Sequence, residues 1–136
     1  MTSIGSYAFM GCSGLTSLTL SKRLTTIGRE AFRGCTRLTS VIIPNGVTIV
    51  SGGMFSDCTN LVSVYIPSSV SSINWYAFGG CNRLTTVKVN IDNPLYIEKT
   101  VFSNSANATL YVPKGCVDIY SQKSGWSDFK TIKEMN

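Results

Sequence analysis

The segment Ile27–Ile49 reads IGREAFRGCTRLTSVIIPNGVTI, and versions of it recur along the chain at a fixed spacing of 23 residues. Five columns keep this spacing in four copies, three of them with identical residues and two with conservative replacements. The columns are Phe9, Phe32, Phe55 and Phe78; Cys12, Cys35, Cys58 and Cys81; Leu15, Leu38, Leu61 and Leu84; Ile4, Ile27, Val50 and Ile73; and Leu18, Val41, Val64 and Val87. Five columns in register predict a repeat protein.

A unit of 23 residues is too small to bury its own apolar side chains, so each copy must stack on the next. Equivalent residues then form ladders with one rung per coil, at about the 4.8 Å spacing of paired strands. A fifth copy begins at Ile97 and keeps an aromatic residue at Phe102, but Ser105 and Ala108 stand where Cys and Leu are expected. We therefore expect about five coils, and a first coil without a polar cap suggests an N-terminally truncated array.

Each copy combines a strand pattern with a helix-like pattern. Side chains alternate along a strand, so in Ser40–Ile43 we expect Val41 and Ile43 to point inward and Ser40 and Ile42 to face outward. The other half, Ile27–Cys35, spaces its apolar residues as one face of a short helix or helical turn. The sequence thus predicts short parallel strands on one face and short helices or turns on the other.

Composition and charge exclude several classes of function. The chain has no histidine, and its seven acidic residues do not recur at the repeat period, so we expect no enzyme activity, cofactor or metal site. No apolar run approaches the roughly 18 residues that a membrane span needs. The net charge of +5 comes largely from Lys22–Arg37, and the next two copies carry almost no charge, so nucleic acid is not the expected partner. The buried Cys column predicts reduced, unreactive thiols.

The outward positions of the strands supply the first candidate site. Their central column is varied, whereas the core columns beside it are uniform, and this contrast is expected of a sheet that recognises a ligand. The candidate ligand-binding residues are Thr19, Ile42, Tyr65, Lys88, Ser40 and Ser63. The alternative is that these are ordinary strand-forming residues on an open sheet.

Trp75 and Tyr76 form the second candidate site. They occupy the repeat positions of Arg29 and Glu30, on the predicted turn side, where polar residues are expected. Exposed aromatic residues of this kind can anchor a partner protein or a sugar ring. Alternatively, they pack against the irregular fifth copy or the C-terminal segment.

The recurring A-F-x-G-C-x-x-L-T-S-V-x-I-P-x-x-V-x-x-I pattern closely resembles the BspA-like leucine-rich repeat family, from Ile4 to about Leu95. The ending, with Leu110–Gly115 followed by Tyr120, Trp126 and Phe129, is similar to the terminal segment of bacterial members. The resemblance implies a solenoid over residues 1–113 and a capping segment over 114–136. The cap would hold a helix over Cys116–Lys123 and a closing strand over Phe129–Lys133.

The predicted fold is therefore an α/β, right-handed leucine-rich-repeat solenoid with a C-terminal cap. The resemblance implies a non-catalytic, cell-surface or secreted module of a host-associated bacterium that binds host or matrix proteins through the concave strand face. A structural spacer with no ligand of its own is the alternative, and a carbohydrate-binding surface around Trp75 and Tyr76 is a third reading.

Overall fold

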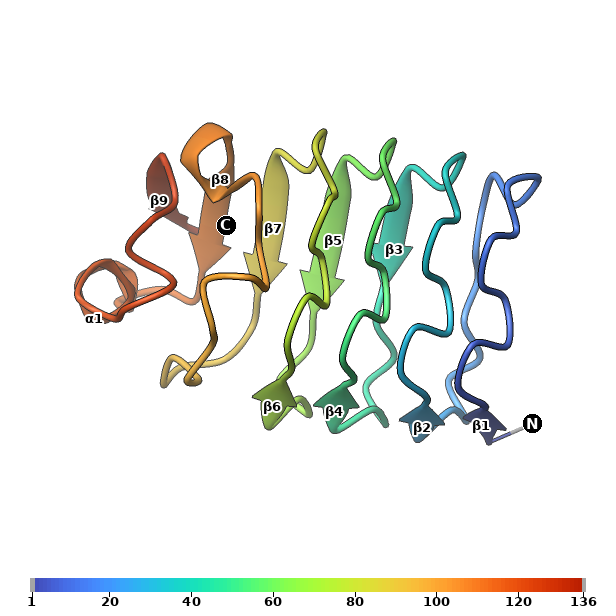
Figure 1. Ribbon diagram of the computed structural model, residues 1–136. Coiled ribbons are helices and arrows are strands. Elements are labelled where there is room, and N and C mark those ends of the chain that lie inside the picture. The colour runs from blue at the N-terminus through green and yellow to red at the C-terminus, as the bar shows by residue number, and fades with distance from the viewer. Residues whose placement is uncertain (1, 136) are drawn as a thin grey trace.

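The computed structural model describes residues 2–135 as a single stack of coils (Figure 1). Five parallel strands lie side by side in sequence order along one side of the stack. They are β3 (Ser40–Ile42), β5 (Ser63–Ile66), β7 (Thr86–Val89), β8 (Thr109–Val112) and β9 (Thr131–Glu134). A second row of two-residue strands contains β1 (Ser3–Ile4), β2 (Thr26–Ile27), β4 (Ile49–Val50) and β6 (Ser72–Ile73). The predicted solenoid is confirmed.

The register of the sheet follows the repeat. Val41 pairs with Val64, Val64 with Val87, and Val87 with Leu110, and all four side chains are buried. The alternation expected for Ser40–Ile43 is also observed, with Val41 and Ile43 inside and Ile42 outside. The first copy differs, because the segment around Thr19 forms no strand. The row of paired strands therefore begins at β3.

The third side of each coil is built from turns, which are one of the two forms expected there, and not from short helices. We call this side the turn column; it comprises residues 5–12, 28–35, 51–58 and 74–81. Within one coil, the amides of Ala31, Arg33 and Cys35 donate to the carbonyls three residues earlier. The amides between them, on Glu30, Phe32 and Gly34, donate to carbonyls of the next coil at 2.8–3.0 Å. Alternate amides thus bond between coils, which an α-helix would forbid.

Two positions in each coil of the turn column have left-handed backbone. The first is occupied by Tyr7, Glu30, Gly53 and Tyr76, and the second by Gly11, Gly34, Asp57 and Gly80, all with φ between 54° and 75°. Left-handed residues interrupt a right-handed helix. Every second amide then points toward the next coil and donates to a carbonyl there. Glycine fills the second position in three of the four copies, and Asp57 fills it in the remaining one.

Side-chain ladders fill the interior. Phe9, Phe32, Phe55, Phe78 and Phe102 stack with centroids 5.2–5.7 Å apart and planes within 9° of parallel. All five thiols are free, and those of Cys35, Cys58 and Cys81 each donate to the carbonyl of a Phe in the preceding coil at 3.1–3.3 Å. The thiols are therefore structural hydrogen-bond donors within the core.

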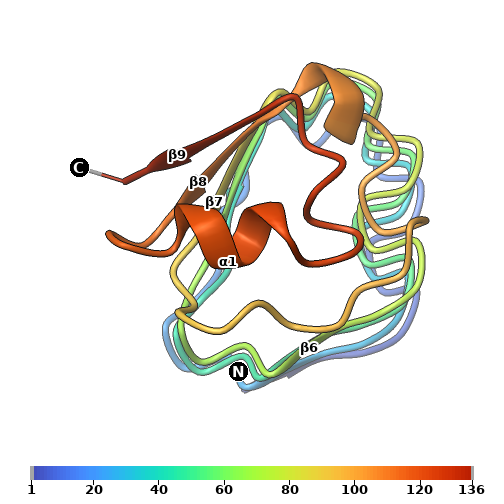
Figure 2. The ribbon, with the colours of Figure 1, turned by 90° about the vertical axis from the view of Figure 1, so that its left-hand side faces the viewer.

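The C-terminal segment closes the stack. The helix α1 (Val117–Ser121) lies across the end of the coils (Figure 2), within the range expected for a capping helix. Tyr120 and Trp126 are fully buried, and they donate to the carbonyls of Ile91 at 2.6 Å and Leu95 at 2.8 Å. A short 3-10 helix, η1 (Ser105–Asn107), precedes β8. None of the helices formed by residues 2–135 has the length and apolar character needed to traverse a bilayer.

Candidate functional site

The outward side of the five-stranded sheet, which we call the sheet face, carries one continuous column of large side chains. Ile42 pairs with Tyr65, Tyr65 with Lys88, Lys88 with Tyr111, and Tyr111 with Lys133. Ile42 is 70% exposed, a high value for a branched aliphatic side chain. The sequence-predicted residues Ile42, Tyr65 and Lys88 are thus brought together on neighbouring strands.

A row of hydroxyl groups runs beside this column. Ser40, Ser63, Thr86, Thr109 and Thr131 are paired in register across the five strands. Ser40 and Ser63, predicted as candidates, line the same hollow of about 530 Å³ as Ile42 and Tyr65. The sheet face therefore offers apolar, aromatic and hydroxyl groups side by side.

Two further hollows extend this surface toward both ends of the stack. One, of about 510 Å³, includes Thr19 and Lys22 beside Ile42, so Thr19 joins the surface from an irregular segment. The other, of about 530 Å³, adds Tyr111 and Glu134. Tyr65 lines all three hollows and is the centre of the sheet face.

The charge of the sheet face is mainly positive. Lys22 and Lys88 line its hollows, and Lys133 continues its central column. The Lys88 Nζ atom lies 5.8 Å from the centroid of the Tyr111 ring, which places the ammonium group over an aromatic face. The carboxylate of Glu134 accepts a hydrogen bond from the Gly115 amide at 2.6 Å. These charges favour a partner with acidic groups.

The second candidate pair lies on the turn column, on the other side of the coils. Trp75 and Tyr76 are 43% and 52% exposed. A Cβ atom on Gly52 would lie 2.3 Å from Trp75 Cε2, so the indole rests directly on the backbone of the preceding coil. A Cβ atom on Gly79 would lie 2.4 Å from Tyr76 Cδ1. The surface that supports Trp75 is therefore the Gly52 backbone, which neither reading of the sequence anticipated.

Three charged residues lie beside the two rings. Arg33 Nη1 donates to Glu30 Oε1 at 2.5 Å, and Arg33 Nε donates to Asp57 Oδ2 at 3.3 Å. Together with Trp75 and Tyr76 they line a hollow of about 440 Å³. We call this surface the turn-face hollow.

Sequence reasoning missed several of these residues. Tyr111 stands 23 residues after Lys88, so the repeat spacing alone could have added it to the column. Lys133 is displaced by one residue, because β9 follows β8 at a spacing of 22. For the turn-face hollow, the signal was Gly52 and Gly53, which stand where the preceding copy has two long side chains.

A family model and one solved structure support the fold described above. The family model for the BspA type leucine-rich repeat region matches residues 1–123 in six copies, compared with the roughly five coils expected. A leucine-rich repeat protein of T. pallidum is 21% identical over 98% of this chain, with a TM-score of 0.53. A leucine-rich repeat protein from Bacteroides ovatus is 17% identical over 99% of this chain, with a TM-score of 0.45.

This chain spans 63% and 52% of the lengths of those two proteins. None of the curated proteins matches it. The family model covers most of the chain, and the turn, strand and ladder columns recur in the structure as they do in the sequence. The chain belongs to the family of BspA-type leucine-rich repeat proteins.

Proposed function

We propose that this module is non-catalytic and binds a partner protein through the sheet face. One observation carries the proposal: the outward column of the sheet is large, varied and accessible, whereas the inward column is almost uniform. Ile42 is 70% exposed and Tyr65 is half-buried beside it. Covering both with a partner would remove apolar area from water and so favour binding.

The shape of the sheet face favours a protein over a small molecule. Its three hollows adjoin one another through Tyr65 and extend across all five strands. Protein interfaces place aromatic anchors at the centre and polar groups at the rim, and Tyr65 flanked by the hydroxyl row has this arrangement. We infer that the partner has an apolar patch bordered by carboxylates, which would meet Lys22, Lys88 and Lys133.

The family supports the setting in which such binding would act. BspA-type repeats are typical of surface or secreted bacterial proteins. We therefore propose an extracellular or surface-attached location, with host or matrix proteins as the partners. The few charged residues, 14% of the chain, and the many hydroxyl groups are compatible with this location.

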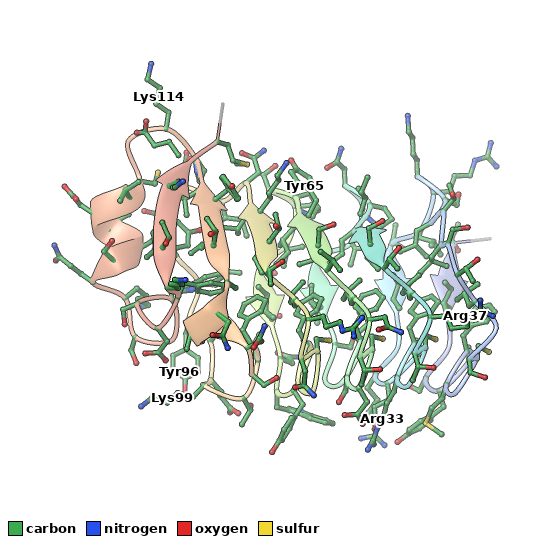
Figure 3. The ribbon with its side chains drawn as sticks, turned by 90° about the horizontal axis from the view of Figure 1, so that it is seen from above. Arg33, Arg37, Tyr65, Tyr96, Lys99 and Lys114 are labelled. Atoms are coloured by element: carbon green, nitrogen blue, oxygen red, sulfur yellow. The ribbon has the colours of Figure 1, made fainter. Side chains whose placement is uncertain are left out.

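The test is binding to a panel of purified extracellular-matrix proteins by surface plasmon resonance. The double variant Tyr65→Ala, Ile42→Ser should lose the saturable signal, because it removes the central aromatic anchor and its apolar neighbour. The matched control is Tyr96→Ala, Ile49→Ser, which removes the same side-chain types from other exposed positions; Figure 3 shows Tyr96 on the side away from Tyr65.

Both variants must melt like the parent protein for the comparison to hold. A signal lost in both variants, or kept in both, would contradict binding at the sheet face. No saturable signal for the unmodified protein would support the spacer alternative instead. Weaker association at high salt would agree with the lysine-rich rim.

A further inference from the structure

The turn-face hollow contains two aromatic platforms that are supported from behind and open in front. The indole of Trp75 rests on Gly52, and the ring of Tyr76 packs against Gly79, with no side chain in either place to separate ring from backbone. The rings nevertheless remain 43% and 52% exposed. An aromatic ring that packs on the backbone with one face and is exposed on the other is already ordered before a ligand binds. This order reduces the conformational entropy lost on binding.

Charged groups stand next to these rings. A Cβ atom on Gly53 would lie 2.7 Å from Glu30 Cγ and 3.7 Å from Trp75 Cζ3, so the glutamate and the indole approach the same point of the backbone. The Glu30 side chain is only 13% exposed. Arg33 forms one ion pair with Glu30 and a second with Asp57 of the neighbouring coil. Hydrogen-bond donors and acceptors are therefore fixed at the edge of an aromatic surface.

Glu30, Asp57 and Arg33 together carry a net charge of −1, but both carboxylates are already engaged by Arg33, which favours a neutral ligand over a cation. Both carboxylates are already paired with Arg33, and this pairing raises the pKa of the guanidinium through its hydrogen bonds to Glu30 and Asp57. A cationic ligand would have to compete with Arg33 for the two acceptors. The hydroxyl groups of a sugar can instead donate to a carboxylate and accept from a guanidinium at the same time.

From these contacts we propose that the turn-face hollow binds a neutral carbohydrate. A sugar ring packs its apolar C–H face on Trp75, the neighbouring ring contacts Tyr76, and their hydroxyl groups bond to Glu30, Arg33 and Asp57. The hollow of about 440 Å³ falls within the range of roughly 300–1,000 Å³ of small-molecule sites.

This site is separate from the sheet face. Arg33 and Tyr65 project from opposite sides of the molecule in Figure 3, and the residues that line the turn-face hollow line none of the three sheet-face hollows. Failure of one proposal therefore leaves the other unaffected. A single module could hold a protein on one side and a glycan on the other.

The test is calorimetric titration with tetrasaccharides of glucose, mannose, galactose and N-acetylglucosamine. We expect saturable binding of at least one of them, little changed by added salt, and a change in tryptophan fluorescence. That change would come from Trp75, because Trp126 is fully buried. Trp75→Ala should weaken binding by about tenfold or more, as expected for loss of a central aromatic anchor.

Tyr7→Ala is the matched control. Tyr7 occupies the same repeat position as Tyr76, has the same left-handed backbone and is similarly exposed, but it lies outside the hollow. This variant should bind as the parent does, whereas Tyr76→Ala should not. The proposal is overturned if no tetrasaccharide binds saturably or if Trp75→Ala binds unchanged. Binding of a hexa-arginine peptide that salt abolishes, with no sugar bound, would overturn it in favour of a cation site.

Discussion

At the scale of single residues, the cysteine ladder links burial to pH. Each of Cys58 and Cys81 occupies a fully buried site and donates to a Phe carbonyl of the preceding coil. Burial disfavours the thiolate, and it raises the pKa of Cys81 to about 12 from an ordinary value of 9.0. The pKa of Cys58 is raised as well, again chiefly by burial. In the unfolded chain both thiols have the ordinary pKa of 9.0.

This difference predicts a loss of stability in alkaline solution. Below pH 9 the thiols are protonated in both states, and the stabilisation is complete; as the pH rises toward 12, the unfolded state alone loses protons. Between about pH 8 and pH 10, Cys81 should lower the free energy of unfolding by about 1 kcal/mol. Urea unfolding at the two pH values measures this change.

The Cys81→Ala variant removes that contribution, so its alkaline loss should be smaller than that of the parent by about 1 kcal/mol. Val64→Ala serves as the control, because it also shortens a buried side chain but carries no titrating group. It should lower stability equally at both pH values. An alkaline loss of the same size in Cys81→Ala as in the parent would contradict the assignment.

At the scale of elements, the turn column is where the sequence left two conformations open. Its apolar spacing fitted a short helix or a helical turn, because Ile27, Ala31 and Phe32 do lie on one side. The backbone that places them there is a series of turns with two left-handed residues per coil. Glu30, Asp57 and Tyr76 occupy such positions although they are not glycine. The residue types at these positions therefore do not predict a left-handed backbone. Hydrogen bonds between coils compensate for the strain, and they are invisible in a single copy of the repeat.

The strand half was predictable for the opposite reason. Inward positions repeat because each must fit against its copy in the next coil, so their columns identify the core directly. Outward positions are free to vary, and alternation alone placed Ile42, Tyr65 and Lys88 on one surface. The contact of Trp75 with the Gly52 backbone could not be read in this way, because the repeat places both residues in one column without giving the direction of the indole ring.

The left-handed positions also give a prediction for the turn column. Gly34 has φ of +74°, and a Cβ atom there would meet only Gly11 at 3.6 Å, an ordinary contact. Gly34→Ala should therefore cost about 1–2 kcal/mol through backbone strain alone. The control is Gly14→Ala, where the space is open and φ is not left-handed; its effect should stay within about 0.5 kcal/mol. Denaturant unfolding of both variants measures the difference, and equal costs would contradict a conformational origin.

At the scale of the whole molecule, the ladders make each coil depend on its two neighbours and on little else. Sheet pairs, turn-column hydrogen bonds and Phe stacking all join residues about 23 positions apart. In such an array the stability is approximately a sum over coils and the interfaces between them. One whole coil should therefore be removable, provided that the register of every column is kept.

Deletion of residues 24–46 meets this condition. It joins Arg23 to Val47, which takes the buried position of Leu24, and it leaves the sheet as β5, β7, β8 and β9. We expect a folded, less stable protein that still unfolds cooperatively. Its denaturant m-value should fall by about one sixth, the share of the chain removed, 23 of 136 residues. Fluorescence of the buried Trp126 reports the transition in both proteins.

A shorter deletion, of residues 35–46, provides the decisive contrast. It removes only 12 residues, but it joins the turn column at Gly34 directly to Val47, so the next stretch of chain arrives without its strand. The retained turn segment with Phe32 would then have no strand segment of its own, so the Phe ladder and the core columns beneath β5 could not both keep their register. In the 24–46 deletion, by contrast, the turn and strand segments of the first coil both move beneath the coil that contains β5. This variant should lose its cooperative transition although it retains more of the sequence. If it proved as stable as the variant lacking a whole coil, the register of the ladders would not be what holds the molecule together.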